Sequence, residues 1–184
     1  MGRAGVGLLL LMTHYNKAQM LAIWRTALGL DTAYAECSIE QFDGLNVNDL
    51  IAQRMRQWYL NLLDTADPAL LPTADIAARC TRVARPDNAT AITLPDDCRR
   101  VLHIRAASWP MAIAPSADSA RAALLGHPFA APTARRPLAI ATLRSILIAP
   151  CAPADAIEVL AVVDPGDQLY TLDESLLATI PTTL

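Results

Sequence analysis

The chain has 184 residues, of which 53% are hydrophobic and 18% are charged. Such a composition excludes disorder as the dominant state, and this length suits one domain that buries a substantial core. The net charge of −3 does not favour non-specific nucleic-acid binding, because a protein that tracks phosphate groups needs a positive field. We therefore expect no specific nucleic-acid partner.

Residues 1–12 contain an apolar run, Gly5 to Met12, that follows Arg3. The run is about as long as the shortest signal-peptide cores, but no small-x-small cleavage site follows it. It is too short to span a bilayer. We expect residues 1–12 to be a disordered or non-native start, with Met12 as an alternative initiator. A secretory signal is the alternative interpretation.

The next part of the chain has helical patterns. Asn16 with Gln19 three residues later matches a capping box, and apolar residues at helical spacing then lead to a stop at Gly29, which predicts a helix over about 17–29. The segment 31–44 fits either a short helix or a loop.

The strongest helical pattern covers residues 46–63, where apolar residues form one continuous stripe. Trp58 belongs to this stripe, so we expect its ring in the core or at an interface rather than at a ligand site. After a proline-containing break, Thr73 is a suitable cap for a third helix over 73–83.

After Pro86 the pattern changes from a helical period to alternation, which is typical of strands. A short inserted helix is expected over 116–125, and Asp173 is a suitable cap for a C-terminal helix. The expected strands are residues 89–94, 101–107, 111–114, 138–143, 145–149, 157–163 and 169–172.

The order of these elements predicts an α+β fold, in which N-terminal helices precede a mainly antiparallel β part. We expect residues 13–184 to form a single domain. Its helical part would cover 13–85 and its β-rich part 86–184.

No catalytic or metal-binding motif is evident. The cysteines Cys37, Cys80, Cys98 and Cys151 are far apart and have no closely spaced histidine, so we expect free thiols rather than a zinc site or disulfides. The glycines fit neither a dinucleotide fingerprint nor a Walker sequence. We therefore expect no cofactor, no metal and no enzymatic activity.

A small enzyme or ligand-binding domain is the alternative. Its candidate residues are the paired carboxylates Asp96 and Asp97, together with His103 and His127. Adjacent acids after a proline more often cap a turn in water, and a histidine on a mixed strand face is ordinarily structural. His127 falls in a loop, where function concentrates, but one histidine defines no site.

Charged residues divide into two opposite segments. Residues 79–105 carry six arginines and three acids, whereas residues 151–184 carry six acids and no lysine or arginine. This polarity fits a head-to-tail contact between copies that closes into a ring. Pairing within one monomer, or simple solvation, is the alternative. Trp109, beside a proline at a strand break, is a candidate anchor. The candidate assembly interface consists of Arg99, Arg100, Arg105, Trp109, Asp173 and Glu174.

Three stretches carry a family resemblance. The first is the helix end Arg56–Leu63 with the following Leu70–Ala77. The second is Ile92–Arg105, in which a leucine-proline-acid-acid sequence precedes a strand, and the third is Arg135–Ile140. Together these stretches resemble the head–tail adaptor, or connector ring, proteins of tailed bacteriophages and prophages.

The resemblance implies a non-enzymatic structural subunit with a helical part and a β part, which forms ring oligomers beneath a portal. The implied partners are copies of the chain itself and portal or other tail-connector proteins, with no membrane. The implied location is the cytoplasm of a bacterial host during assembly, and then the virion. If residues 1–12 are a signal, a secreted interaction domain is the alternative.

Overall fold

In the computed structural model, the described residues are 12–30, 46–86, 88–127 and 129–182. The chain divides into two compact units, each of which is described by itself. The helical unit comprises the chain up to Pro72 and the residues from Asp164 onward. The strand unit comprises Thr73–Val163.

The predicted α+β class is confirmed, because the chain combines helices with antiparallel sheets. The division between the two kinds of structure falls at Thr73 rather than at residue 86, and the segment after Val163 belongs with the helices. The expectations for residues 1–11 and 31–44 lie outside the described residues.

In the helical unit, helix α1 (Lys17–Ala27) begins at the predicted capping box. The backbone N–H of Gln19 donates to Asn16 Oδ1 at 2.8 Å, and the N–H of Asn16 donates to Gln19 Oε1 at 2.9 Å. Gly29 follows the helix with φ of +70°, a conformation that favours glycine. A short strand that the sequence did not predict, β1 (Thr13–Asn16), pairs antiparallel with β9 (Leu169–Leu172).

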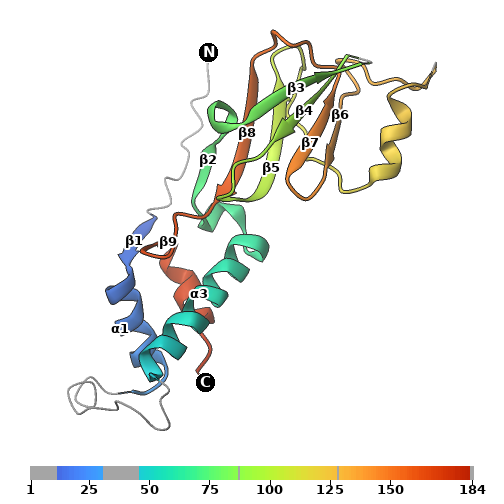
Figure 1. Ribbon diagram of the computed structural model, residues 1–184. Coiled ribbons are helices and arrows are strands. Elements are labelled where there is room, and N and C mark those ends of the chain that lie inside the picture. Colours follow the sequence, from blue (N-terminus) through green and yellow to red (C-terminus); the bar gives the residue numbers. More distant parts are fainter. Residues whose placement is uncertain (1–11, 31–45, 87, 128, 183–184) are drawn as a thin grey trace, which may run out of the picture. The chain divides into compact units, whose positions relative to one another are not determined.

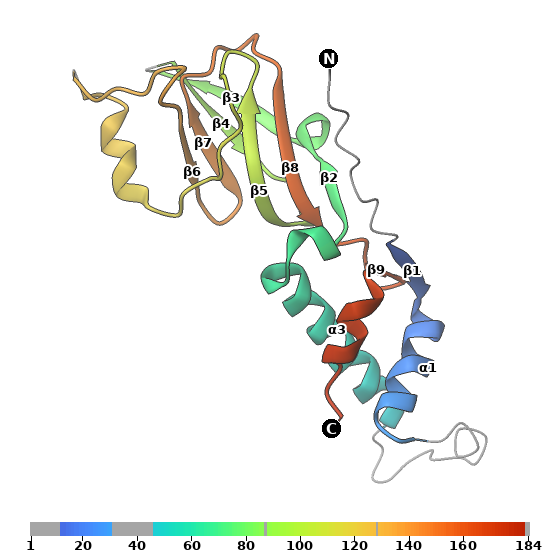
Figure 2. The same ribbon diagram turned by 180° about the vertical axis from the view of Figure 1, so that it is seen from behind.

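Helix α3 (Val47–Thr65) confirms the strongest sequence pattern. The buried side chains of its stripe are Ile51, Met55, Tyr59, Leu62 and Leu63. They form a core with Met20 and Trp24 of α1 and with Tyr170 and Leu172 of β9. The predicted C-terminal helix is present as the 3-10 helix η4 (Glu174–Thr179), and another 3-10 turn, η1 (Pro68–Leu70), follows α3. In both views η4 lies alongside α3 (Figure 1, Figure 2).

Trp58 is less buried than its place on the stripe predicts. Its side chain is only half-buried, with the ring edge-on to Trp24 at 5.8 Å between centroids. The indole N–H donates to Thr179 Oγ1 of η4 at 3.2 Å. Trp58 therefore seals the margin of this core.

The predicted helix over 73–83 is wrong. This stretch forms β2 (Thr73–Asp75), the 3-10 turn η2 (Ala77–Arg79) and β3 (Thr81–Arg85). Asp75 Oδ1 accepts from the backbone N–H groups of Ala77, at 2.9 Å, and of Val159, at 3.0 Å. This carboxylate turns the chain and holds it against a strand distant in sequence, so tertiary pairing overrides the local helical spacing.

The strand unit contains two antiparallel sheets. Together with β9 of the helical unit, they confirm the predicted strands after Pro86 apart from 111–114. One has the order β2-β8-β5 and the other β3-β4-β7-β6. The remaining strands are β4 (Ala89–Thr93), β5 (Cys98–Ala106), β6 (Leu138–Ala141), β7 (Ser145–Ala149) and β8 (Ile157–Val163). The expected strand over 111–114 is a single bridge between Ile113 and Ile104. The inserted helix is the 3-10 helix η3 (Ser119–Leu124).

Side chains from both sheets of the strand unit build one apolar core. Alternating residues of β5 and β8 contribute Ile104, Ala106, Val159 and Ala161, and the four-stranded sheet contributes, among others, Ile92, Ala139, Ile146 and Ile148. Period-two alternation places these residues on one face of each strand, so the sheets bury a common layer.

Candidate assembly interface

At least three of the six arginines in the basic segment 79–105 have partners within the strand unit. Arg79 pairs with Asp97 at 2.5 Å, and Arg105 of β5 lies 3.8 Å from Glu158 on the neighbouring β8. Arg82 donates to the backbone carbonyl of Asp155 at 2.8 Å. Of these contacts, the one between Arg105 and Glu158 pairs a charge of the basic segment with a charge of the acidic segment within one chain.

Arg99 and Arg100 both lie near the start of β5, where the pairing with β8 is irregular. Cys98 is opposite Val163 and Arg100 is opposite Val162, so Arg99 lies at a register shift. The Arg99 side chain is exposed and that of Arg100 is half-buried. A bulge of this kind re-aims a side chain relative to the sheet.

The acidic segment 151–184 is divided between the two units. In the strand unit, Asp155 Oδ2 accepts from Ser108 Oγ at 2.9 Å, and Glu158 faces Arg105. In the helical unit, Asp164 forms an ion pair with Arg56, and Asp167 lies 3.9 Å from Lys17. The segment is therefore not one continuous acidic surface.

Asp173 and Glu174 also have local roles in the helical unit. Asp173 caps η4, because its Oδ1 accepts from the backbone N–H of Ser175 at 2.9 Å and from Ser175 Oγ at 2.5 Å. These bonds lower the pKa of the Asp173 carboxyl. Glu174 Oε1 accepts from Thr13 Oγ1 at 3.2 Å and from Tyr15 Oη at 3.4 Å, which ties η4 to β1.

The structure corrects the expectation for Trp109. Its side chain is only 2% exposed and belongs to the core of the strand unit. Its indole N–H donates to the carbonyl of Pro150 at 2.7 Å. Trp109 is a core residue with a satisfied polar atom and offers no surface for anchoring a partner.

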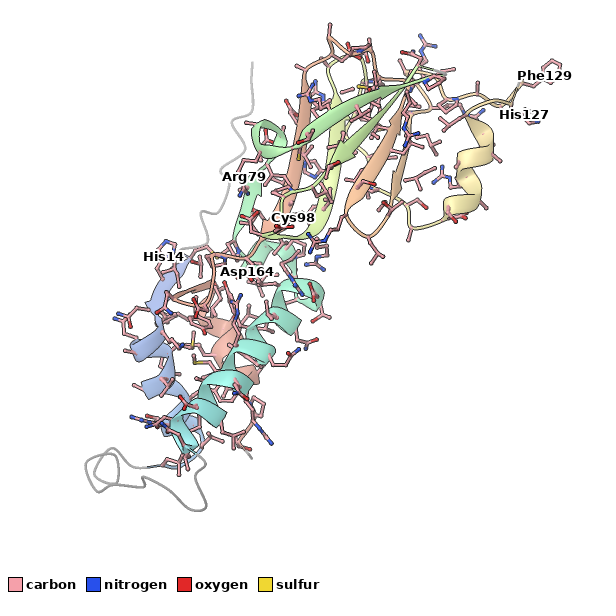
Figure 3. The ribbon with its side chains drawn as sticks, viewed as in Figure 1. His14, Arg79, Cys98, His127, Phe129 and Asp164 are labelled. Carbon is pink, nitrogen blue, oxygen red and sulfur yellow. The ribbon has the colours of Figure 1, made fainter. Side chains whose placement is uncertain are left out.

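The residues of the alternative enzyme do not assemble into one site. Asp97 pairs with Arg79, and Asp96 with Arg144 of the β6–β7 turn. His103 projects from β5 and is exposed. His127 lies instead at the outer tip of the segment between β5 and β6, next to Phe129 (Figure 3). There His127 Nδ1 accepts from the backbone N–H of Ala130 at 3.1 Å, which closes a turn.

A polar hollow of about 540 Å³ opens on the helical unit. Its lining residues are Lys17, Asp49, Ala52, Gln53, Arg56, Gln57, Asp167 and Tyr170. Arg56 is already held by Asp164 and by the carbonyl of Gly166 at 2.9 Å. Burial raises the pKa of Tyr170, so its phenol stays protonated at neutral pH. The hollow offers hydrogen-bonding groups, but its arginine is engaged in holding the turn that precedes β9.

The sheet edges of the strand unit differ in how they are covered. Ile113 exchanges two 2.9 Å backbone hydrogen bonds with Ile104 at the edge of β5. Ser116 makes two such bonds, of 2.9 and 2.8 Å, with Ala139 and Ala141 at the edge of β6. The third edge strand, β2, has only three residues, whereas β3 has five, all exposed. Sequence reasoning missed β3, although the turn-forming Pro86 and Asn88 before β4 were a hairpin signal.

The most exposed large apolar side chains belong to separate elements of the strand unit. Among the described residues, the large hydrophobics that are more than half exposed are Val83, Met111, Phe129 and Leu143. All of them lie in the strand unit, on β3, in the segment between β5 and β6, or in the β6–β7 turn. Phe129 is 94% exposed. It lies at the outer tip of the segment between β5 and β6 (Figure 3).

Comparisons with known protein families, with curated proteins and with solved structures return no match. Within the described ranges, no helix is both long and apolar enough to cross a membrane. The same residues include no group of three histidine, cysteine, aspartate or glutamate side chains placed to hold a metal ion.

Proposed function

We propose that this chain is a structural assembly protein, a connector subunit of the head–tail type that its sequence resembles. It works by binding copies of itself and portal or other tail-connector proteins, first in the cytoplasm of a bacterial host and then in the virion. The observation that carries the proposal is the surface of the strand unit. This unit carries both exposed large apolar side chains and an uncovered strand edge.

Exposed apolar side chains support protein binding more directly than the charges do. Single surface hydrophobics are ordinary, but Val83, Met111, Phe129 and Leu143 all belong to one unit. Aromatic and methionine side chains are also enriched at protein interfaces. Arginines that already pair within the unit, such as Arg79 and Arg105, would add rim contacts of low energy.

The charged candidate residues should contribute less to association than the apolar ones. Of the candidate interface residues, Arg99 and Arg105 are exposed on β5, and Arg105 already lies 3.8 Å from Glu158. Asp173 and Glu174 accept hydrogen bonds within the helical unit. The Glu174 side chain is nevertheless exposed, and that of Asp173 is partly exposed. Association that uses them should weaken with salt, because exposed charges are screened over about 8–10 Å at ordinary ionic strength.

The test is sedimentation of the full chain over a wide concentration range, alone and with the portal protein encoded nearest to its gene. We expect a ring-sized species or a complex with portal. The variant Phe129→Ser should weaken this association, and the variant Phe129→Leu should largely retain it. A chain that stays monomeric at every concentration and ignores portal would overturn the proposal.

A further inference from the structure

Strand β3 is the uncovered edge of the four-stranded sheet. Its backbone register against β4 decides which of its polar groups face outward. Leu94, just after β4, donates its backbone N–H to the carbonyl of Arg144, on the side of β7. Backbone N–H and C=O groups alternate in direction along a strand. Those of Ile92 and Thr90 therefore also point toward β7. The intervening residues of β4 therefore bond to β3.

The same alternation fixes the outer groups of β3. Thr81, Val83 and Arg85 are opposite Thr93, Ala91 and Ala89, and these are the hydrogen-bonded pairs. The N–H and C=O groups of Arg82 and Ala84 must then point away from the sheet. Among the described residues, no backbone group bonds to them. Alternating donors and acceptors in this arrangement match another extended peptide and do not match a sugar–phosphate chain.

Two arginines make this edge positive. Arg85 is exposed and Arg82 donates to the carbonyl of Asp155, and neither lies within ion-pair distance of a described carboxylate. The Asp155 carboxylate itself accepts from Ser108 Oγ and from the N–H of Ala152. Arg82 and Arg85 lie on opposite faces of the strand, because their positions differ by an odd number.

We propose that the β3 edge binds an extended acidic segment of a partner protein, which adds to the sheet as a fifth strand. Its backbone pairs with Arg82 and Ala84. One acidic side chain on each face lies against Arg82 and Arg85, and a β-branched residue covers Val83. A second copy of β3 is a poor occupant, because its arginines would gather with the first pair. This like-charge repulsion, together with Pro86, protects the edge from self-pairing.

The inference deepens the proposed function, since it names the kind of partner segment that the connector would take. The probe is a fluorescent synthetic peptide with the central sequence Glu-Thr-Val-Glu-Thr flanked by serines. Replacing both glutamates by lysine gives the control peptide. Binding to the full chain is measured by fluorescence anisotropy, and the amide signals of Arg82 and Ala84 are followed by NMR. We expect saturable binding of the acidic peptide, with selective shifts and slowed hydrogen exchange at these two amides.

Variants separate strand addition from simple charge attraction. Ala84→Pro removes an outward N–H that β4 does not use, and should weaken peptide binding about tenfold, through the lost bond and the ring clash. Arg85→Glu should weaken it severalfold. Arg135→Glu, which changes an exposed arginine of the same unit outside β3, should leave binding unchanged. Thermal unfolding checks that each variant is folded.

Three results would overturn the inference. They are absence of shifts at Arg82 and Ala84 in the unaltered chain, equal binding of the lysine peptide, or equal binding of a thymidine oligonucleotide that Ala84→Pro does not affect. The last would make the edge an anion surface. If the peptide binds as expected but the chain never associates with itself or portal, the proposed function fails and the edge site stands. If connector assembly is normal in Ala84→Pro and no peptide binds, only the edge inference fails.

Discussion

In the helical unit, a side chain seals the edge of the β1–β9 ribbon. The buried phenol of Tyr59 donates to the carbonyl of Thr171 at 2.9 Å and accepts from its N–H at 3.0 Å. In the strand unit, edges are sealed by backbone segments around Ile113 and Ser116, and that of β3 is left open. The contrast shows that edge backbone groups are bonded by a side chain in one unit, whereas at β3 of the other unit they have no backbone partner among the described residues.

Side-chain ties outside the core also join distant segments of the helical unit. Ties between distant segments of the helical unit include His14 Nδ1 to Thr171 Oγ1 at 2.8 Å and Arg56 to Asp164. The buried cluster of the strand unit is almost wholly apolar, and its strands are joined by ladders.

The largest expected effect is that of Trp109→Ala in the strand unit. The change empties a buried site and removes the bond to Pro150, so the free energy of unfolding should fall by about 3–5 kcal/mol. Trp109→Phe, which keeps most of the volume, should cost clearly less. Chemical denaturation measures both. Unchanged stability in Trp109→Ala would mean an exposed ring, and would restore this residue as an interface anchor.

Tyr59→Phe tests the polar closure of the helical unit. The ring volume stays, but Thr171 loses the partner of both its backbone groups, so stability should fall by about 1–3 kcal/mol. Tyr170→Phe is the matched control, since its ring also packs in this core, with its centroid 5.0 Å from that of Tyr59. A loss in Tyr170→Phe as large as in Tyr59→Phe would contradict the special role of the Tyr59 hydroxyl.

The buried phenol of Tyr59 should also lower the free energy of unfolding at alkaline pH. Burial, as the main cause, raises the pKa of its phenol to about 12 from the usual 10.0. A raised folded-state pKa gives stability that is complete below the unfolded-state pKa and is lost as pH rises from 10 to 12. That loss should reach at most about 2–3 kcal/mol. Denaturation curves across this range should show a smaller decline in Tyr59→Phe, and equal declines would indicate that other groups control it.

Trp58→Ala should reduce the free energy of unfolding by less than the same substitution at a core tryptophan. The half-buried ring contributes its contact with Trp24 and its bond to Thr179, so we expect a loss of about 1–2 kcal/mol. Trp58→Phe should recover part of it. A cost equal to that of Trp109→Ala would show that the stripe on α3 is buried across its full width, as the sequence pattern alone suggested.

Features encoded locally were predictable from the sequence. The capping box at Asn16, the stripe of α3 and the alternation of β8 depend on residues within one element. The errors depend on distant partners. β1 exists because Leu169–Leu172 lies beside it, and β2 is a strand because it pairs with β8. No local pattern distinguishes these from a loop or a helix.

The candidate interface was predictable only in part, for the same reason. Charge counts located an arginine-rich and an acid-rich segment, but could not show that Arg105 lies opposite Glu158 across two strands. Trp109 beside Pro110 was consistent with an exposed break, yet the indole bonds to a carbonyl 41 residues away. Arg82 and Arg85 became candidates only once β3 proved to be an edge.

The smallest expected effect concerns the cysteines, and it reports on opening of the strand unit. The three described cysteines, Cys80, Cys98 and Cys151, are free thiols, as predicted, while Cys37 lies outside the described residues. Burial, as the main cause, raises the pKa of Cys98 to about 11. Only about a thousandth of this thiol is then ionised at pH 8, and the thiolate is the reactive form.

In a Cys37→Ser background, iodoacetamide should therefore modify Cys98 of the native chain slowly, with a rate that rises about tenfold per pH unit below its pKa. Cys151 is 2% exposed, so it should react only when the strand unit opens. Mass spectrometry of timed samples measures each site, and full denaturation should make all three react together. If Cys98 reacts natively as fast as an unprotected thiol, the start of β5 must open while the rest of the core is closed. Binding of the acidic peptide at β3 should leave the labelling of Cys151 unchanged or slower, because an added strand can only hold the sheet more firmly.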